Sequence, residues 1–262
     1  MQLPITGDKN QAVRRAAILE YLESDGAIKV TDLGDALKTS LVTIRKDLDE
    51  LEREGLLRRV HGGAIKNYTS QYNASFADRR NLKKPEKKRI AAATADLVSE
   101  GDSVIISAGS TCSYVCEALK TKENLIVITN SLSHFNDLAF CHNITTFFLG
   151  GRFDSDMQIT VGDDVNDQLT KYTADKLIMG IDGIDIHGGA TSYNHVEDFI
   201  MRQMILQAKR RILIADDSKI GKVTFAHIAD ITAFDTIVTN CTKENEKVLR
   251  EIERLGIRVI TV

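Results

Sequence analysis

The sequence predicts an α/β protein in two parts: an N-terminal winged helix-turn-helix domain, and a larger α/β domain built on a mostly parallel sheet. Two observations lead to this prediction. Helical periodicity near the N-terminus is followed by a short alternating run that contains the pair Gly62-Gly63. Farther along, short β-rich runs alternate with helical stretches. We therefore place the two domains at residues 1–66 and 76–262, joined by the polar linker 67–75.

Composition and charge restrict the classes of function. The chain has 262 residues, 43% apolar and 27% charged, which is the balance of an ordinary globular protein. Its net charge of −3 argues against a protein that coats nucleic acid, but allows a local basic module. The apolar runs are shorter than the ~20 residues of a membrane helix, and the start lacks the apolar core of a signal peptide. We expect a cytoplasmic protein with no membrane partner.

The cysteines and histidines indicate no metal site. Cys112, Cys116, Cys141 and Cys241 lack the spacing of zinc ligands, and the six histidines are scattered. We expect no cofactor and reduced thiols. A redox role for Cys112 and Cys116, which could share one helix face, is the alternative.

Two helices are expected first in the N-terminal domain. Apolar residues spaced for a helix cover residues 11–25, and Gly26 is a stop signal. A second, short helix is expected over residues 31–39, with Thr31 as its N-cap. Gly34 in its middle costs roughly 1 kcal/mol relative to alanine, so we expect close packing there. The residues expected to face inward are Leu33, Ala36 and Leu37.

A third helix follows after a tight turn. Ser40 is its predicted N-cap and Gly55 its stop. An apolar stripe recurs at intervals of three and four residues, so this helix has one inward face. The stripe consists of Leu41, Ile44, Leu48 and Leu51, whereas Val42, Thr43 and Lys46 point away from it and Arg45 lies at its edge.

The run "LLRRVHGGAIK" after Gly55 is typical of a β-hairpin with local positive charge, which completes a winged helix. A second basic stretch covers Arg79–Arg89. It could contact DNA phosphates, or it could be a solvated linker and first helical turn around Pro85. The sequence leaves both readings open.

The second domain is predicted from its alternating elements. The apolar runs are short enough for strands of a parallel sheet that is covered on both faces. Strands are expected near residues 102–107, 125–129, 144–151, 175–185, 210–216, 235–239 and 257–262, and helices near 87–98, 112–119, 132–140 and 196–208.

Loops with small polar residues follow three of the predicted strands, at 107–111, 129–131 and 150–151. The carboxyl ends of parallel strands meet at one edge, where ligands bind. In the first loop, Gly109 permits close approach while Ser110 and Thr111 offer donors at a helix N-terminus, an arrangement suited to phosphate. A plain strand-to-helix turn is the alternative. The second loop adds Asn130 and Ser131.

Fixed spacings in the N-terminal part resemble the signature of DeoR-family bacterial transcriptional regulators. The matching residues are Arg14, Ile18 and Leu22, then "SLVTIRKDL" and the wing-like "RRVHGGAI". The motifs "GDSVIISAGST", "VITNSL", "FLGG", "GIDGID" and "ADDSKIGK" resemble that family's sensor domain, so the likeness spans nearly the whole chain. It implies a repressor of a carbohydrate-metabolism operon that binds double-stranded operator DNA and responds to a phosphorylated sugar. One module reads one half-site, so we expect a homo-oligomer.

In a winged helix the third helix lies in the major groove. We expect Thr43 to meet a base or a thymine methyl group, and Lys46 to reach guanine or phosphate. Phosphate contacts are expected from Arg45 and from the wing. The predicted DNA-binding residues are Ser40, Thr43, Arg45, Lys46, Arg58, Arg59 and His61, with Asp47 as a structural partner of a nearby cation.

The second domain also resembles ribose-5-phosphate isomerase, whose acidic residues are matched by Asp182, Asp185 and Glu197. His187 stands where the isomerase has a lysine, which argues against an enzyme because isomerisation requires a base and an electrophile. Asp182 and Glu197 could still hold sugar hydroxyls. Lys219 could face the phosphate or be a surface lysine. The alternatives to a regulator are a sugar-phosphate isomerase with an appended DNA-binding module, and a constitutive DNA-binding protein with a vestigial pocket.

Overall fold

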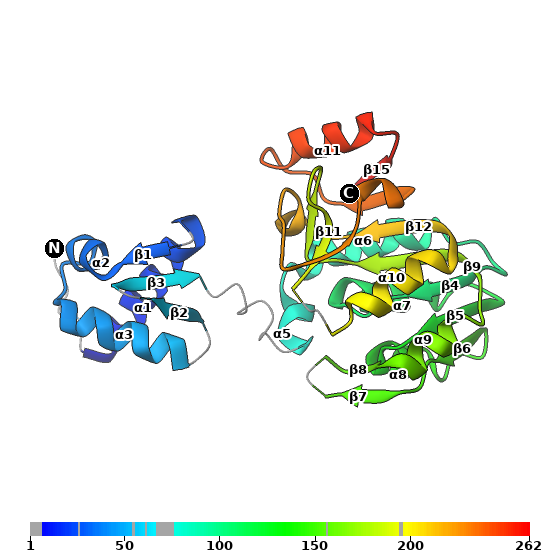
Figure 1. The fold of residues 1–262 in the computed structure, drawn as a ribbon, viewed down its shortest axis with the longest axis horizontal. Helices are drawn as coiled ribbons and strands as arrows, with labels where there is room; N and C mark the ends of the chain where they lie inside the picture. Colours follow the sequence, from blue (N-terminus) through cyan, green and yellow to red (C-terminus); the bar gives the residue numbers. More distant parts are fainter. Residues whose placement is uncertain are drawn as a thin grey trace. The chain divides into compact units, whose positions relative to one another are not determined.

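The computed structural model (Figure 1) describes residues 7–25, 27–53, 56–60, 62–66, 76–155, 157–193 and 196–262. The chain forms two compact units, Met1–Ala74 and Ser75–Val262. The predicted linker 67–75 lies outside the described residues, as do Gly26, Gly55 and His61.

The N-terminal unit is a winged helix-turn-helix, as predicted (Figure 1). Its β1, β3 and β2 form an antiparallel sheet in that order, so the wing hairpin gains a third strand. Ile18, Leu22, Ile44 and Leu48 fill its core. The elements are α1 (Gly7–Asp25), β1 (Ala27–Lys29), α2 (Val30–Ala36), α3 (Leu41–Arg53), β2 (Leu57–Val60) and β3 (Gly63–Lys66).

Ser40 caps α3 as predicted, because its Oγ accepts a hydrogen bond of 3.2 Å from the Thr43 N–H. The prediction that Thr31 caps α2 is wrong. The helix begins at Val30, with Lys29 as N-cap, because the Val30 N–H bonds to the Gly62 carbonyl at 2.9 Å and carries β1 directly into the helix.

Packing within the N-terminal unit differs from expectation at two positions. Ala36 is exposed, and Leu41 is 38% exposed, although both were expected to face inward. Ala36 is the last residue of α2 and Leu41 the first residue of α3, on either side of the turn that joins the two helices. Packing around Gly34 is close, since a Cβ there would lie 2.6 Å from Leu41 Cδ2 and the Leu41 side chain would have to shift.

The C-terminal unit contains the predicted parallel sheet, with strand order β15-β14-β12-β9-β4-β5-β6. Every neighbouring pair is parallel. The strands are β4 (Ser103–Ile106), β5 (Leu125–Thr129), β6 (Ile144–Phe148), β9 (Ala174–Gly180), β12 (Ala208–Ile214), β14 (Thr236–Thr239) and β15 (Arg258–Thr261).

Two apolar clusters cover the two faces of this sheet. Side chains from α6 (Lys84–Ala95), α7 (Ser110–Leu119) and α8 (Leu132–Leu138) belong to one cluster. Side chains from α9 (Asp163–Leu169), α10 (Asp198–Leu206) and α11 (Glu246–Arg254) belong to the other. The carboxyl ends of the strands remain available for loops that can bind a ligand.

Several elements were not expected from the sequence. The stretch expected as one strand over 175–185 is divided between β9 and β10, because the chain leaves the main sheet after Gly180 to pair with β11. The helices α9 and α11 were not predicted either. The other additional elements are α5 (Phe76–Asn81), the hairpin of β7 (Arg152–Asp154) and β8 (Ile159–Val161), the antiparallel sheet of β10 (Gly183–Asp185), β11 (Gly189–Ser192) and β13 (Ala226–Ala229), and the 3-10 turns η1 (Asp217–Lys219) and η2 (Ile231–Ala233). Within the described ranges, no helix is long and apolar enough to span a membrane.

Candidate functional site

The outward face of α3 presents side chains to solvent near the start of the helix. Val42 is 73% exposed, and Arg45 and Lys46 are also exposed. Thr43 is half-buried, and its Oγ1 lies 2.8 Å from the Ser40 hydroxyl. The structure therefore places Ser40, Thr43, Arg45 and Lys46 together on one end of one helix. That they contact DNA stays a prediction.

The wing is joined to α3 by Arg59. Its N–H donates to Glu52 Oε1 at 2.6 Å, and its Nε lies 3.5 Å from Asp49 Oδ1. A phosphate contact by the Arg59 side chain would have to compete with Asp49, because Glu52 accepts only the backbone N–H. Arg58 lies in β2 opposite Ile65, and the predicted contact by His61 falls outside the described residues.

The predicted phosphate loop lies between β4 and α7. Gly109 is the N-cap residue of α7 and has a φ of 146°, a conformation that favours glycine. The first N–H groups of a helix have no partners inside it, and the helix dipole makes this end attractive to anions. Ser110 and Thr111 form the first turn, as predicted.

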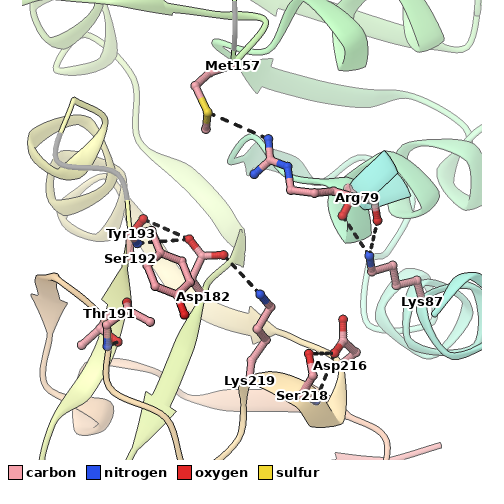
Figure 2. Close-up of polar contacts among 12 residues, drawn as sticks. Arg79, Lys87, Met157, Asp182, Thr191, Ser192, Tyr193, Asp216, Ser218 and Lys219 are labelled. Carbon is pink, nitrogen blue, oxygen red and sulfur yellow. Dashed lines mark hydrogen bonds and ion pairs between the residues drawn. The ribbon is translucent and has the colours of Figure 1, made fainter. Parts of the chain in front are cut away.

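Lys87 is a residue of this site that sequence reasoning missed. Although charged, it is only 5% exposed. Its Nζ donates to the Arg79 carbonyl at 2.5 Å and to Ser110 Oγ at 3.1 Å. Figure 2 shows Lys87 pointing to the backbone of Arg79. Helical spacing contained the signal, because Lys87 shares the buried face of α6 with Ile90, Ala91 and Thr94.

Positive charge is concentrated around Lys87. Burial is the main factor that lowers the Lys87 pKa to about 8, and the charges of Lys219, Arg79 and Lys83 lower it further, against the opposing effect of Asp216. The Arg79 guanidinium also lies 3.9 Å from the Met157 sulfur (Figure 2). The basic stretch 79–89 thus contributes two side chains to the candidate site of the C-terminal unit, which neither interpretation of the sequence anticipated.

Asp182 and Lys219 lie on the opposite side of the site in Figure 2. Their Oδ1 and Nζ atoms are 3.5 Å apart, and the other carboxylate oxygen of Asp182 accepts from Ser192 Oγ and the Tyr193 N–H at 3.3 Å each. Asp185 has a different role, because its Oδ1 accepts the N–H groups of His187 and Gly188 and so holds a turn.

Glu197 is nearly buried, with 6% exposure. Burial is the main factor that raises its pKa to about 7, and the charge of Asp182 raises it further. Within the part of the chain that the structure describes, Glu197 Oε1 and Asn130 Oδ1 are buried without hydrogen-bond partners. Both atoms could bind hydroxyl groups of a ligand.

Ser131 and Gly150, in the second and third predicted loops, make contacts that hold the structure. Ser131 is the N-cap of α8, with its Oγ 3.4 Å from the His134 N–H. The Gln168 side chain accepts the Gly150 N–H and donates to the Gly150 carbonyl, so both backbone groups of this residue in the third predicted loop already have partners. Among the described residues, no group of three His, Cys, Asp or Glu side chains could hold a metal ion. Cys112 and Cys116 are buried free thiols, and burial raises the pKa of each.

Comparison with known proteins matches both units. A model of the DeoR-like helix-turn-helix domain matches residues 14–70, and a model of the DeoR C-terminal sensor domain matches residues 82–241. The HTH-type transcriptional repressor GlcR of Bacillus subtilis is 31% identical over 95% of this chain and 96% of its own length. The glycerol-3-phosphate regulon repressor of Escherichia coli is 30% identical over 88% and 91%.

Two solved structures are similar at lower identity. The sorbitol operon regulator SorC from Klebsiella pneumoniae has a TM-score of 0.42 at 12% identity, over 93% of this chain and 99% of that one. The ribose 5-phosphate isomerase of Plasmodium falciparum has a TM-score of 0.37 at 18% identity, over 51% of each chain.

Proposed function

This chain belongs to the DeoR family of transcriptional regulators, and from that membership we propose that it represses an operon of carbohydrate metabolism and is released from operator DNA by a phosphorylated sugar. It carries both the helix-turn-helix domain and the sensor domain of the family. Relatives are named as repressors of the glycerol-3-phosphate regulon, of an aga operon and of a lactose phosphotransferase system. These names support a sugar-related operon for this chain.

The observation that carries the proposal is the buried ammonium group of Lys87. Its two hydrogen-bond acceptors, the Arg79 carbonyl and the Ser110 hydroxyl, are uncharged. The charge of Asp216 offsets this burial only in part, and a buried charge without a counterion hydrogen-bonded to it is costly. A phosphate group at the start of α7 would supply that counterion and would also accept from the free N–H groups of the helix. Arg79 and Lys219 add further positive charge.

The sugar end of the effector is assigned to the acidic side of the site. Asp182, Glu197 and Asn130 offer carboxyl and amide groups, which suit hydroxyls and not a second phosphate. The proposed effector site therefore consists of Gly109, Ser110, Thr111, Asn130, Ser131, Asp182, Glu197 and Lys219, with Arg79 and Lys87 in addition.

We propose that this site binds the sugar phosphate without converting it. Asp185 of the isomerase-like motif is engaged in a turn, and the exposed His187 stands at the isomerase's lysine position. An effector can shift the protein away from the DNA-binding state only if it binds the two states with unequal affinity. A homo-oligomer that reads paired half-sites and works in the cytoplasm completes the proposal.

The proposal is tested with DNA from the intergenic regions beside this gene and a panel of pentose and hexose phosphates. We expect one phosphate ester, and not the free sugar, to release the protein. Lys87→Met, which keeps the length of the side chain but removes its charge, should require at least about tenfold more effector. Lys84→Met changes an exposed lysine of the same helix and is the control. Equal effector sensitivity of Lys87→Met and the parent would refute the assignment.

A further inference from the structure

His134 lies behind the proposed phosphate loop. It is fully buried, and its Nε2 is 3.3 Å from the Gly109 carbonyl oxygen. A carbonyl oxygen can only accept, so Nε2 carries the hydrogen and the neutral ring has its lone pair on Nδ1. Burial lowers the pKa of His134 to about 4, which keeps the ring neutral near pH 7.

The Gly109 carbonyl is held from two elements. It accepts the Ser113 N–H at 3.1 Å and the Ser113 hydroxyl at 3.4 Å from α7, and His134 approaches it from α8. The peptide bond between Gly109 and Ser110 is planar and trans, so the Ser110 N–H points in the opposite direction from this carbonyl. Holding the carbonyl therefore also holds the N–H that opens α7.

A purely structural role explains this histidine poorly. Nδ1 of His134 is buried with no hydrogen-bond partner among the residues that the structure describes. Such an atom is costly, and an apolar side chain of similar volume would avoid the cost. His134 also lies in the first turn of α8, directly after the second loop of the site, and Ser131 Oγ accepts its backbone N–H. The residue thus links the loops that follow β4 and β5.

We propose that His134 is a positioning residue of the effector site, which orients the Gly109–Ser110 peptide so that the N–H groups at the start of α7 face a bound phosphate group. This inference rests on the proposed function, because it assumes that the loop binds phosphate. It adds a residue that contacts the loop and not the ligand.

The test measures binding of inorganic phosphate to the full chain through the NMR signals of the Ser110 and Thr111 amides. His134→Leu removes the donor at similar volume and should weaken phosphate binding about three- to tenfold. His134→Gln places an amide N–H near the position of Nε2 and should restore most of the affinity. His142→Leu, at an exposed histidine after α8, should bind phosphate like the parent.

The outcomes separate this inference from the proposed function. If the parent shows no response to phosphate, both fail together. If the parent responds and His134→Leu responds with the same affinity, the inference alone fails. If Leu and Gln weaken binding equally and lower the melting temperature equally, His134 has only a structural role. In the parent, the nitrogen shifts of His134 should show a protonated Nε2 and an unprotonated Nδ1, and the reverse tautomer would also refute the inference.

Discussion

Arg14 on α1 and Asp47 on α3 form an ion pair through two contacts, in which Arg14 Nη2 lies 3.1 Å from Asp47 Oδ1 and Arg14 Nε contacts Oδ2. Asp47 is only 1% exposed, although it belongs to the helix expected to read DNA. The predicted structural role of this acid is therefore confirmed. The pair joins the first helix to the third and so contributes to the orientation of the outward residues of α3.

Asp47→Ala should destabilise the N-terminal unit by about 3 kcal/mol, because it leaves the Arg14 guanidinium without its buried partner. Hydrogen exchange of the backbone amides in residues 7–66 measures the loss without interference from the sensor unit. Asp49→Ala removes an exposed acid that pairs with Arg59, and should cost less than about 1 kcal/mol. Equal exchange rates in Asp47→Ala and the parent would contradict the importance of the pair.

Arg45→Ala and Lys46→Ala should weaken operator binding while the fold stays intact. A phosphate contact would lower affinity on all DNA sequences and reduce the salt slope by about one unit. A base contact would cost roughly 1–3 kcal/mol at one base pair. Fluorescence anisotropy at several salt concentrations distinguishes the two. Arg53→Ala, at the other end of α3, is the control, and unchanged affinity in both test variants would rule out this reading surface.

Gly109→Val should abolish the response to the effector but leave operator binding in place. A Cβ at Gly109 would have Cys112 Sγ at 3.8 Å as a neighbour, so the damage comes from the φ of 146° and from the branched side chain at the ligand's approach. The effector should raise the melting temperature of the parent and not of the variant. Gly101→Val introduces similar strain at the amino end of β4, where φ is 82°, and should keep the response. A folded Gly109→Val protein that is still released by the effector would place the sensor in another loop.

Glu197 should make the ligand-free sensor unit less stable as the pH rises towards 8. Its pKa rises from 4.5 in the unfolded chain to about 7, so the native state holds an extra proton between these values. The resulting stability is complete below pH 4.5 and is lost as the pH rises through 7. The charges of Asp182 and Asp154 favour this proton, whereas the charge of Arg79 and a hydrogen bond from the Asn130 side chain oppose it.

His134 has the opposite effect on stability. Because its pKa is lower in the folded state, its contribution to the free energy of unfolding grows as the pH rises from 4 to 6.5. The parent must therefore be compared with Glu197→Gln, which isolates the Glu197 effect. Between pH 5 and 8 the parent should lose on the order of 2 kcal/mol of unfolding free energy relative to this variant. Denaturant unfolding measures this free energy. If it changed with pH by the same amount in the parent and in Glu197→Gln, the prediction for Glu197 would be wrong.

The sensor should bind sugar phosphates without turnover. Isomerisation requires an electrophile for the enediolate, and the motif around Asp185 and His187 supplies a turn instead. Proton NMR of each sugar phosphate, incubated with the purified protein, should show no new sugar. A product that appears with the parent and disappears with Asp182→Asn would establish an enzyme.

The sequence by itself determined the elements that depend on local order. The stripe of Ile44, Leu48 and Leu51, the Ser40 cap and the wing are short-range patterns, and a helix or hairpin repeats its geometry every few residues. The seven strands of the parallel sheet were visible for the same reason, since continuous apolar runs fit strands that are buried on both faces.

Only the tertiary structure decided which polar side chains are buried and what they meet. Lys87 is one of many cations in its stretch, and becomes part of the candidate site only because α6 packs beside α7 and brings its Nζ to Ser110. Arg59 is held by acids of α3, and His134 reaches Gly109 across 25 positions of the chain. Such contacts join residues distant in sequence, and the packing of whole helices and strands against one another determines them, which no local period encodes.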